Sequence, residues 1–157
     1  MKSSRFGLLA LAAALALPLA ASSQETEPGE HPGFLAAKGR TTFRVYCASC
    51  HGVDAQGSGS IAQYLTVPPA DLTRIAERRD GEFPRELIHK IIDGREDVRG
   101  HGGKEMPIWG DVFQSPLAET SPPGDETGEE RAERKIRELV LYLESIQVKE
   151  QSPEGEP

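Results

Sequence analysis

Cysteine, methionine and aromatic residues are all scarce in this chain of 157 residues. Two cysteines are too few for a disulfide-dense secreted scaffold, and without a second Cys pair they cannot form a four-cysteine zinc site. Aromatic residues make up 6% of the chain, which is little for a self-sufficient core. No segment has a strong strand pattern, and no internal repeat is visible. The sequence therefore predicts one all-α domain whose core is completed by more than its own side chains.

Positive charge is also in deficit. The chain has 18 Lys and Arg against 25 Asp and Glu, a formal net charge of −7. Two of the positive charges, Lys2 and Arg5, lie in the N-terminal segment, so the remainder carries about −9. So acidic a chain argues against nucleic-acid binding, because phosphates need Lys and Arg. It favours a partner with a basic docking patch, although solubility alone also explains the charge.

No apolar run is long enough for an ordinary membrane span. After Lys2 and Arg5 comes an apolar run of about 15 residues, short of the roughly 20 that a spanning helix needs. Small residues follow it, as in a secretory signal. We predict that residues 1–22 are a signal peptide cleaved near Ser22 or Ser23, which leaves a soluble exported protein. Retention as an N-terminal anchor is the alternative.

Both cysteines lie in Cys47-Ala48-Ser49-Cys50-His51, the C-x-x-C-H pattern of covalent haem attachment. Each thiol can add to one haem vinyl group, and the adjacent imidazole can bind the iron. A thioredoxin-like pair would need a βαβ context, which is not seen. A Cys2His2 zinc site would need a spaced His pair, and a plain disulfide would leave His51 unexplained. The motif predicts one covalent haem c and, because such haem is attached outside the cytoplasm, a periplasmic location.

Few residues of the chain can serve as the second iron ligand. The chain has two methionines, and Met1 lies in the predicted signal peptide. Met106 lies in a Gly- and Pro-rich stretch, where Pro107 restricts the backbone beside it. A thioether opposite an imidazole raises the reduction potential of haem iron. We predict Met106 as the ligand. His101 is the competitor and would give a lower potential, with His89 a weaker candidate.

Apolar spacing of three and four residues predicts helices over residues 33–47, 83–93 and 129–147. Gly94 follows the second helix as a C-terminal cap. Gly39, in the middle of the first, costs about 1 kcal/mol relative to Ala, so close packing against another helix is expected there. The predicted organisation is a signal peptide (1–22), a flexible leader (23–32), one haem domain (33–148) with a solvated acidic insert (114–130), and a disordered tail (149–157).

With these residues in place, the chain resembles a class I cytochrome c from about Phe34 to Gln147. The family carries Gly-x-x-x-Phe before the haem motif and Leu-x-x-Tyr in its last helix; Gly39 with Phe43 and Leu139 with Tyr142 match. The resemblance implies an all-α cytochrome c fold. Its N- and C-terminal helices cross, and short helices and loops surround one covalent haem.

The resemblance also implies roles for residues around the haem. In the family a proline carbonyl accepts the Nδ1–H of the axial histidine, and Pro68 or Pro69 is the candidate for His51. Trp109 is expected to pack beside the haem. The acidic insert between Phe113 and Arg131 departs from the compact members of the family.

These features predict a periplasmic one-electron carrier with His51 and Met106 as iron ligands. It would work with redox protein partners, without nucleic acid or stable membrane insertion, and would not itself be an enzyme. The alternative is a haem c subunit of a periplasmic oxidoreductase complex, such as a dehydrogenase or an oxidase branch. A third class, a ligand-binding or sensor haem protein, would require Met106 to be absent from the iron or labile.

Overall fold

The protein is described from a computed structural model, which defines residues 31–95, 106–118 and 125–149. Every regular element in these ranges is helical, as the sequence predicts. The α-helices are α1 (Pro32–Tyr46), α2 (Ala48–His51), α3 (Arg85–Asp93), α4 (Trp109–Gln114) and α5 (Gly128–Ser145). The short 3₁₀ turns are η2 (Ala62–Tyr64), η3 (Leu72–Arg74), η4 (Glu77–Arg79) and η5 (Pro116–Ala118). None of the helices within the described ranges is long and apolar enough to span a membrane.

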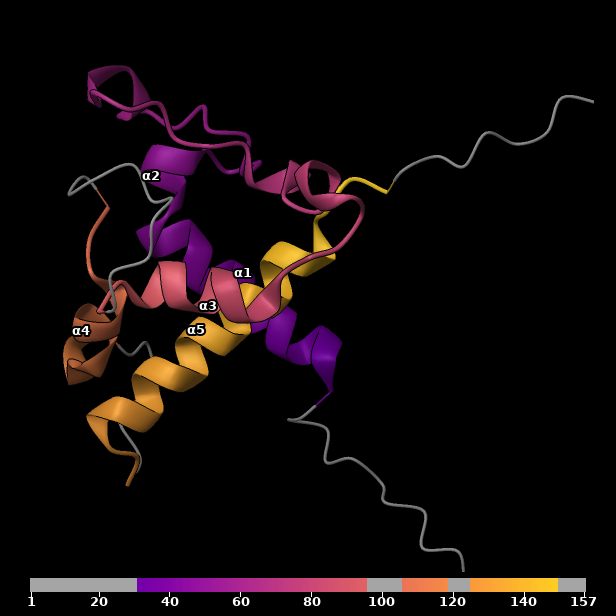
Figure 1. Ribbon diagram of the computed structural model, residues 1–157. Helices are drawn as coiled ribbons and strands as arrows, with labels where there is room; N and C mark the ends of the chain where they lie inside the picture. Colours follow the sequence, from indigo (N-terminus) through magenta and orange to yellow (C-terminus); the bar gives the residue numbers. More distant parts are fainter. Residues whose placement is uncertain (1–30, 96–105, 119–124, 150–157) are drawn as a thin grey trace, which may run out of the picture.

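The two longest helices, α1 and α5, cross each other (Figure 1). Gly39 lies at the crossing, where a Cβ atom would collide with the backbone carbonyl of Glu138. One turn further on, the rings of Phe43 and Tyr142 lie 5.3 Å apart. The packing reason expected for Gly39 is therefore found, because only glycine lets the two backbones approach so closely.

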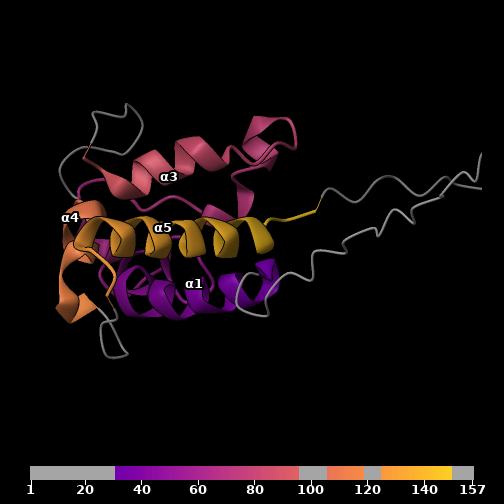
Figure 2. The same cartoon turned by 90° about the horizontal axis from the view of Figure 1, so that it is seen from below.

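Helix α5 is the centre of the packing. Figure 2 shows it between α1 on one side and α3 on the other, and it also contacts α4. Its apolar face is almost wholly buried, with Ile136 at 0% and Leu139 at 1% exposure. A capping box at Thr127 and Glu130 starts the helix, which satisfies backbone N–H groups that would otherwise lack a partner.

The predicted helix bounds agree with the structure to within about two residues. Helix α3 ends at Asp93, and Gly94 caps it in the left-handed conformation, as predicted, with φ of 71°.

The Gly- and Pro-rich composition around Met106 favours a loop, but α4 begins within this stretch at Trp109. Tertiary packing explains this helix, because Trp109 and Phe113 lie one turn apart and pack on each other and on Tyr46 at 5.3–5.7 Å. The expected solvated insert is likewise not all loop, since Gln114 ends α4, Ala118 is buried and α5 begins at Gly128.

Candidate haem site

The C-x-x-C-H motif follows α1 with hardly a break. Cys47 caps α1 through a bond from its N–H to the Phe43 carbonyl at 2.8 Å, and its own carbonyl accepts from the N–H of His51 at 2.9 Å. Cys47 and Cys50 are therefore one helical turn apart, on the same face. Both are free thiols in the structure.

This face of the motif opens onto an apolar cavity of about 320 Å³. Each of the seven predicted site residues lines it. Most of the lining is aliphatic or proline and comes from α1, α3, α5 and the segments between them. The lining residues are Phe43, Tyr46, Cys47, Cys50, His51, Leu65, Val67, Pro68, Pro69, Ala70, Leu72, Ile75, Ile88, Ile91, Ile92, Met106, Pro107, Trp109, Leu139 and Leu143.

His51 faces a backbone carbonyl, but not the one expected. Its Nδ1 lies 3.3 Å from the carbonyl oxygen of Ala70, rather than that of Pro68 or Pro69. The carbonyl oxygen of Pro69 is directed at Gly57, where it occupies the place that a Cβ atom would need. The two prolines still line the cavity, so they form its wall without supplying this contact.

The environment of His51 favours the neutral imidazole. Burial lowers the pKa of His51, and the hydrogen bond to Ala70 offsets part of that effect. Since a carbonyl oxygen can only accept, Nδ1 carries the proton in this bond and Nε2 keeps the lone pair that can bind a metal. A partner at Nδ1 also fixes the plane of a ligating imidazole and raises its basicity.

A tight glycine-containing loop holds the motif in place. The N–H of Gly57 donates to the His51 carbonyl at 2.7 Å, and that of Gly59 donates to the Cys50 carbonyl at 3.0 Å. Gly57 has φ of 83°, and a Cβ on Gly59 would collide with the backbone of Ser49 and Cys50. By composition alone, the glycines of residues 52–60 indicate only a loop. Their packing role was missed because it depends on contacts that composition does not reveal.

Cys47 is partly buried and packs against the core. Burial raises the pKa of its thiol to about 12, with a smaller contribution from Cys50. The thiol is therefore protonated at neutral pH. A neutral thiol in an apolar wall is compatible with a large apolar group beside it.

Met106 and Trp109 approach the cavity from the start of the α4 region. Met106 is partly buried against the core, and Trp109 is 9% exposed. The Trp109 ring stacks on Phe113 at 5.5 Å. It is thus both a core aromatic and part of the cavity wall.

His89 and His101 are the two histidines considered as alternatives to Met106 as iron ligand. His89 points to α5, where its Nε2 lies 3.0 Å from a Glu133 carboxylate oxygen, and it does not line the cavity. His101 lies outside the described residues. Tyr46 also lines the cavity, whereas Tyr64 does not and is 79% exposed.

The residues present fit a covalently bound haem. Two thiols one turn apart and a neutral imidazole with its Nδ1 occupied border one apolar cavity in the middle of the core. Within the described ranges, no group of three His, Cys, Asp or Glu side chains is placed to hold a metal ion by itself. A haem brings its own four nitrogen ligands, so it needs only axial donors from the protein.

Comparison with protein families identifies the chain. Residues 34–116, which are 83 of its 157 residues, match the family described as cytochrome c oxidase, cbb3-type, subunit III. No curated protein and no solved structure matches. The match covers α1 from Phe34 onward, the motif, Met106 and the whole cavity lining except Leu139 and Leu143 of α5. The chain therefore belongs to this family of c-type cytochromes and is an all-α electron-transfer protein with covalent haem c.

Proposed function

We propose that the protein is an exported, periplasmic one-electron carrier whose haem iron is bound by His51 and Met106. One observation carries the ligand proposal: the imidazole of the motif and the only methionine besides Met1 line the same cavity. A bound haem supplies the one-electron couple. The chain supplies the two axial donors and the apolar walls that keep water away. With both axial positions filled, substrate has no place to bind the iron.

Replacement of Met106 tests the ligand pair. Met106→Leu keeps the apolar bulk but removes the thioether. We expect the ferric protein to lose the weak far-red charge-transfer band of methionine–iron coordination, and its reduction potential to fall. His101→Ala is the matched control and should leave both unchanged. A band that survives in Met106→Leu, or a band lost in His101→Ala, would overturn the assignment.

Export rests on the signal-like segment at residues 1–22. Intact-mass measurement of the haem protein recovered from the periplasm is the test. We expect a chain that begins near Ser22 or Ser23 and carries one haem. A full-length, membrane-bound product would show that the segment is retained as an anchor.

The net negative charge of the chain indicates what kind of partner surface it docks on. The chain without residues 1–22 has a formal charge of about −9, so we propose a redox partner with a basic patch that is steered by long-range attraction. Between Cys47 and Ala70, however, Asp54 is the only formally charged residue, and Val53 and Tyr64 are 73% and 79% exposed. Close contact beside the motif would therefore be apolar. Electron transfer to the partner should slow as salt rises, and a rate independent of salt would contradict the steering.

The family description favours a second candidate, a haem subunit of a terminal oxidase. The same haem would then work inside a stable complex. Gentle purification from the native cell separates the two. A carrier elutes as a free monomer, whereas a subunit elutes with the oxidase and its other chains.

A further inference from the structure

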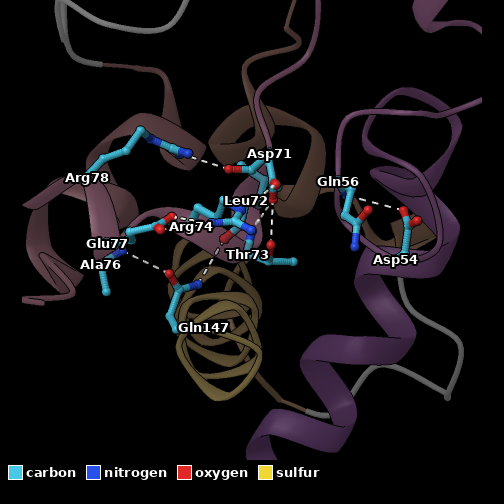
Figure 3. A network of polar contacts seen from close by, with 10 residues as sticks. All are labelled: Asp54, Gln56, Asp71, Leu72, Thr73, Arg74, Ala76, Glu77, Arg78 and Gln147. Atoms are coloured by element: carbon cyan, nitrogen blue, oxygen red, sulfur yellow. Dashed lines mark hydrogen bonds and ion pairs between the residues drawn. The ribbon is translucent and has the colours of Figure 1, made fainter. Parts of the chain in front are cut away.

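Gln147 lies two residues beyond the end of α5, and Figure 3 shows its side-chain amide in contact with Leu72 and Ala76. Its Nε2 donates to the Leu72 carbonyl at 2.9 Å and to the Leu143 carbonyl at 2.6 Å. Its Oε1 accepts from the backbone N–H of Ala76 at 2.9 Å. Because both donors face carbonyl oxygens and the acceptor faces an N–H, the amide is held in one orientation.

These bonds tie the end of α5 to a segment 71 to 75 residues earlier in the chain. The next residue adds a backbone bond, from the N–H of Val148 to the Thr73 carbonyl at 2.9 Å. The tied segment carries Leu72 and Ile75, which line the haem cavity. The amide of Gln147 therefore holds in place the segment that contributes Leu72 and Ile75 to the cavity wall.

The same segment carries the carbonyl that faces His51. Only Asp71 separates Leu72 from Ala70, whose oxygen lies 3.3 Å from His51 Nδ1. Leu72 is held at both ends of its backbone: its N–H donates to the Ala55 carbonyl at 2.8 Å, and its own carbonyl accepts from Gln147. The position of the Ala70 carbonyl thus depends on two hydrogen bonds that clamp Leu72, one to Ala55 and one from Gln147. Of these two partners, Gln147 is the more distant in the sequence.

We propose that Gln147 is a positioning residue for the axial histidine. By holding Leu72, it keeps the Ala70 carbonyl against Nδ1 and so sets the plane and basicity of the His51 imidazole. The proposal rests on the proposed iron ligation by His51. No local sequence pattern marks this role of Gln147, because Leu72 and Ala76 lie more than 70 residues earlier in the chain.

The test compares Gln147→Met with Glu144→Gln in the haem-loaded protein. Gln147→Met keeps the side-chain length and removes all three amide hydrogen bonds. Glu144→Gln, the matched control, weakens the Arg85–Glu144 ion pair near the same end of α5 and leaves the Leu72 clamp intact. Two readouts are needed: the reduction potential, and the rate at which the His51 Nδ1 proton exchanges with solvent, followed by NMR.

We expect Gln147→Met to speed exchange of the Nδ1 proton several-fold. Its potential should shift upward, because a less basic imidazole stabilises ferric iron less. Glu144→Gln should change neither. Gln147→Glu, which keeps an acceptor for Ala76 but loses both donors, should shift both readouts in the same direction as Gln147→Met. A merely structural role of Gln147 would lower stability in both Gln147 variants and move neither readout.

The failures of the two proposals are distinguishable. If wild-type spectra show His51 bound to iron but Gln147→Met leaves the potential and the exchange rate unchanged, the positioning role is wrong and the ligand stands. If wild-type spectra show no iron-bound His51, the ligand proposal fails, and the positioning role fails with it.

Discussion

At the α1–α5 crossing, the lack of a Cβ atom at Gly39 sets how closely the two helix backbones approach. A methyl group on Gly39 would overlap the Glu138 carbonyl, which belongs to helix backbone and cannot swing aside. At most positions within a helix, alanine is favoured over glycine by about 1 kcal/mol. Here the steric conflict outweighs that gain, because separating two packed helices also opens contacts along the rest of their interface.

Gly39→Ala should therefore destabilise the protein by about 1–3 kcal/mol, the usual cost of overpacking a core. Chemical unfolding followed by far-UV circular dichroism measures the change. Ala37→Gly, at an exposed site in the same helix, reports the propensity effect alone and should cost about 1 kcal/mol. An unchanged or raised stability in Gly39→Ala would mean that the helices do not touch at this point.

A charged cluster joins α3 to the start of α5. Asp93 pairs with Arg95, and the Arg95 guanidinium also donates to both carboxylate oxygens of Glu129 at 2.6 and 2.8 Å. The hydrogen bond from Arg95 lowers the pKa of Asp93 below its ordinary value of 3.8, although burial opposes the shift. The ionised Asp93 therefore contributes stability above about pH 4, which is lost as pH falls through its depressed folded-state pKa.

Asp93→Asn should lower the free energy of unfolding at pH 7 by on the order of 1 kcal/mol. It should also shrink the loss of stability between pH 6 and pH 2, because the variant has no carboxylate there to protonate. Urea unfolding at the two pH values tests this. Glu82→Gln, which removes an exposed charge, controls for net charge. Equal acid sensitivity in wild type and Asp93→Asn would contradict the prediction.

At the scale of elements, α5 organises the molecule because it contacts α1, α3 and α4. Its first turn is closed on both sides: Thr127 Oγ1 accepts from the Glu130 N–H at 3.2 Å, and a Glu130 carboxylate oxygen accepts from the Thr127 N–H at 2.8 Å. Because α5 packs on three other helices, loss of its N-terminal cap is expected to lower the stability of the whole fold.

Thr127→Ala should cost about 1 kcal/mol of global stability, within the range of 0.5–2 kcal/mol found for N-cap removal. Thermal or urea unfolding provides the measurement. Thr41→Ala is the control, because Thr41 lies within α1, is exposed and donates its hydroxyl to the carbonyl of Ala37 one turn earlier. The capping role would be refuted if both variants lost the same stability.

For the whole molecule, the free energy of unfolding depends on what fills the cavity. Without a haem, the apolar side chains that line this partly open cavity would remain in contact with water, and each Leu or Ile left exposed in this way forgoes about 1.5–3 kcal/mol of burial. A typical domain has only about 5–15 kcal/mol of stability in total. The haem is therefore part of the core of this protein, as its low aromatic content suggests.

Cys47→Ala/Cys50→Ala, prepared without haem, should lose cooperative unfolding and most near-UV circular dichroism, while some helix remains. The wild-type haem protein is the reference, and differential scanning calorimetry gives the readout. A sharp unfolding transition close to that of the reference would show that the helices pack without the haem.

The sequence was most informative where the chemistry is local. Cys47, Cys50 and His51 occupy one turn, so their spacing alone predicts that they act together. The bounds of α1, α3 and α5 follow from apolar periodicity for the same reason. The sequence also carried a signal that the periodicity analysis did not use, the Thr127-x-x-Glu130 pattern of a capping box.

The sequence by itself determined the cofactor and the candidate iron ligands, because they are encoded within one turn or by a residue type that occurs only twice. It also determined the helical class, because apolar periodicity is a local pattern. Only the tertiary structure decided that the Ala70 carbonyl faces His51, that α4 forms around Trp109 and Phe113, and that Gln147 clamps Leu72. These contacts join residues from about 20 to more than 70 positions apart. No local periodicity records such contacts, since they are fixed by how α1, α3 and α5 pack around the cavity.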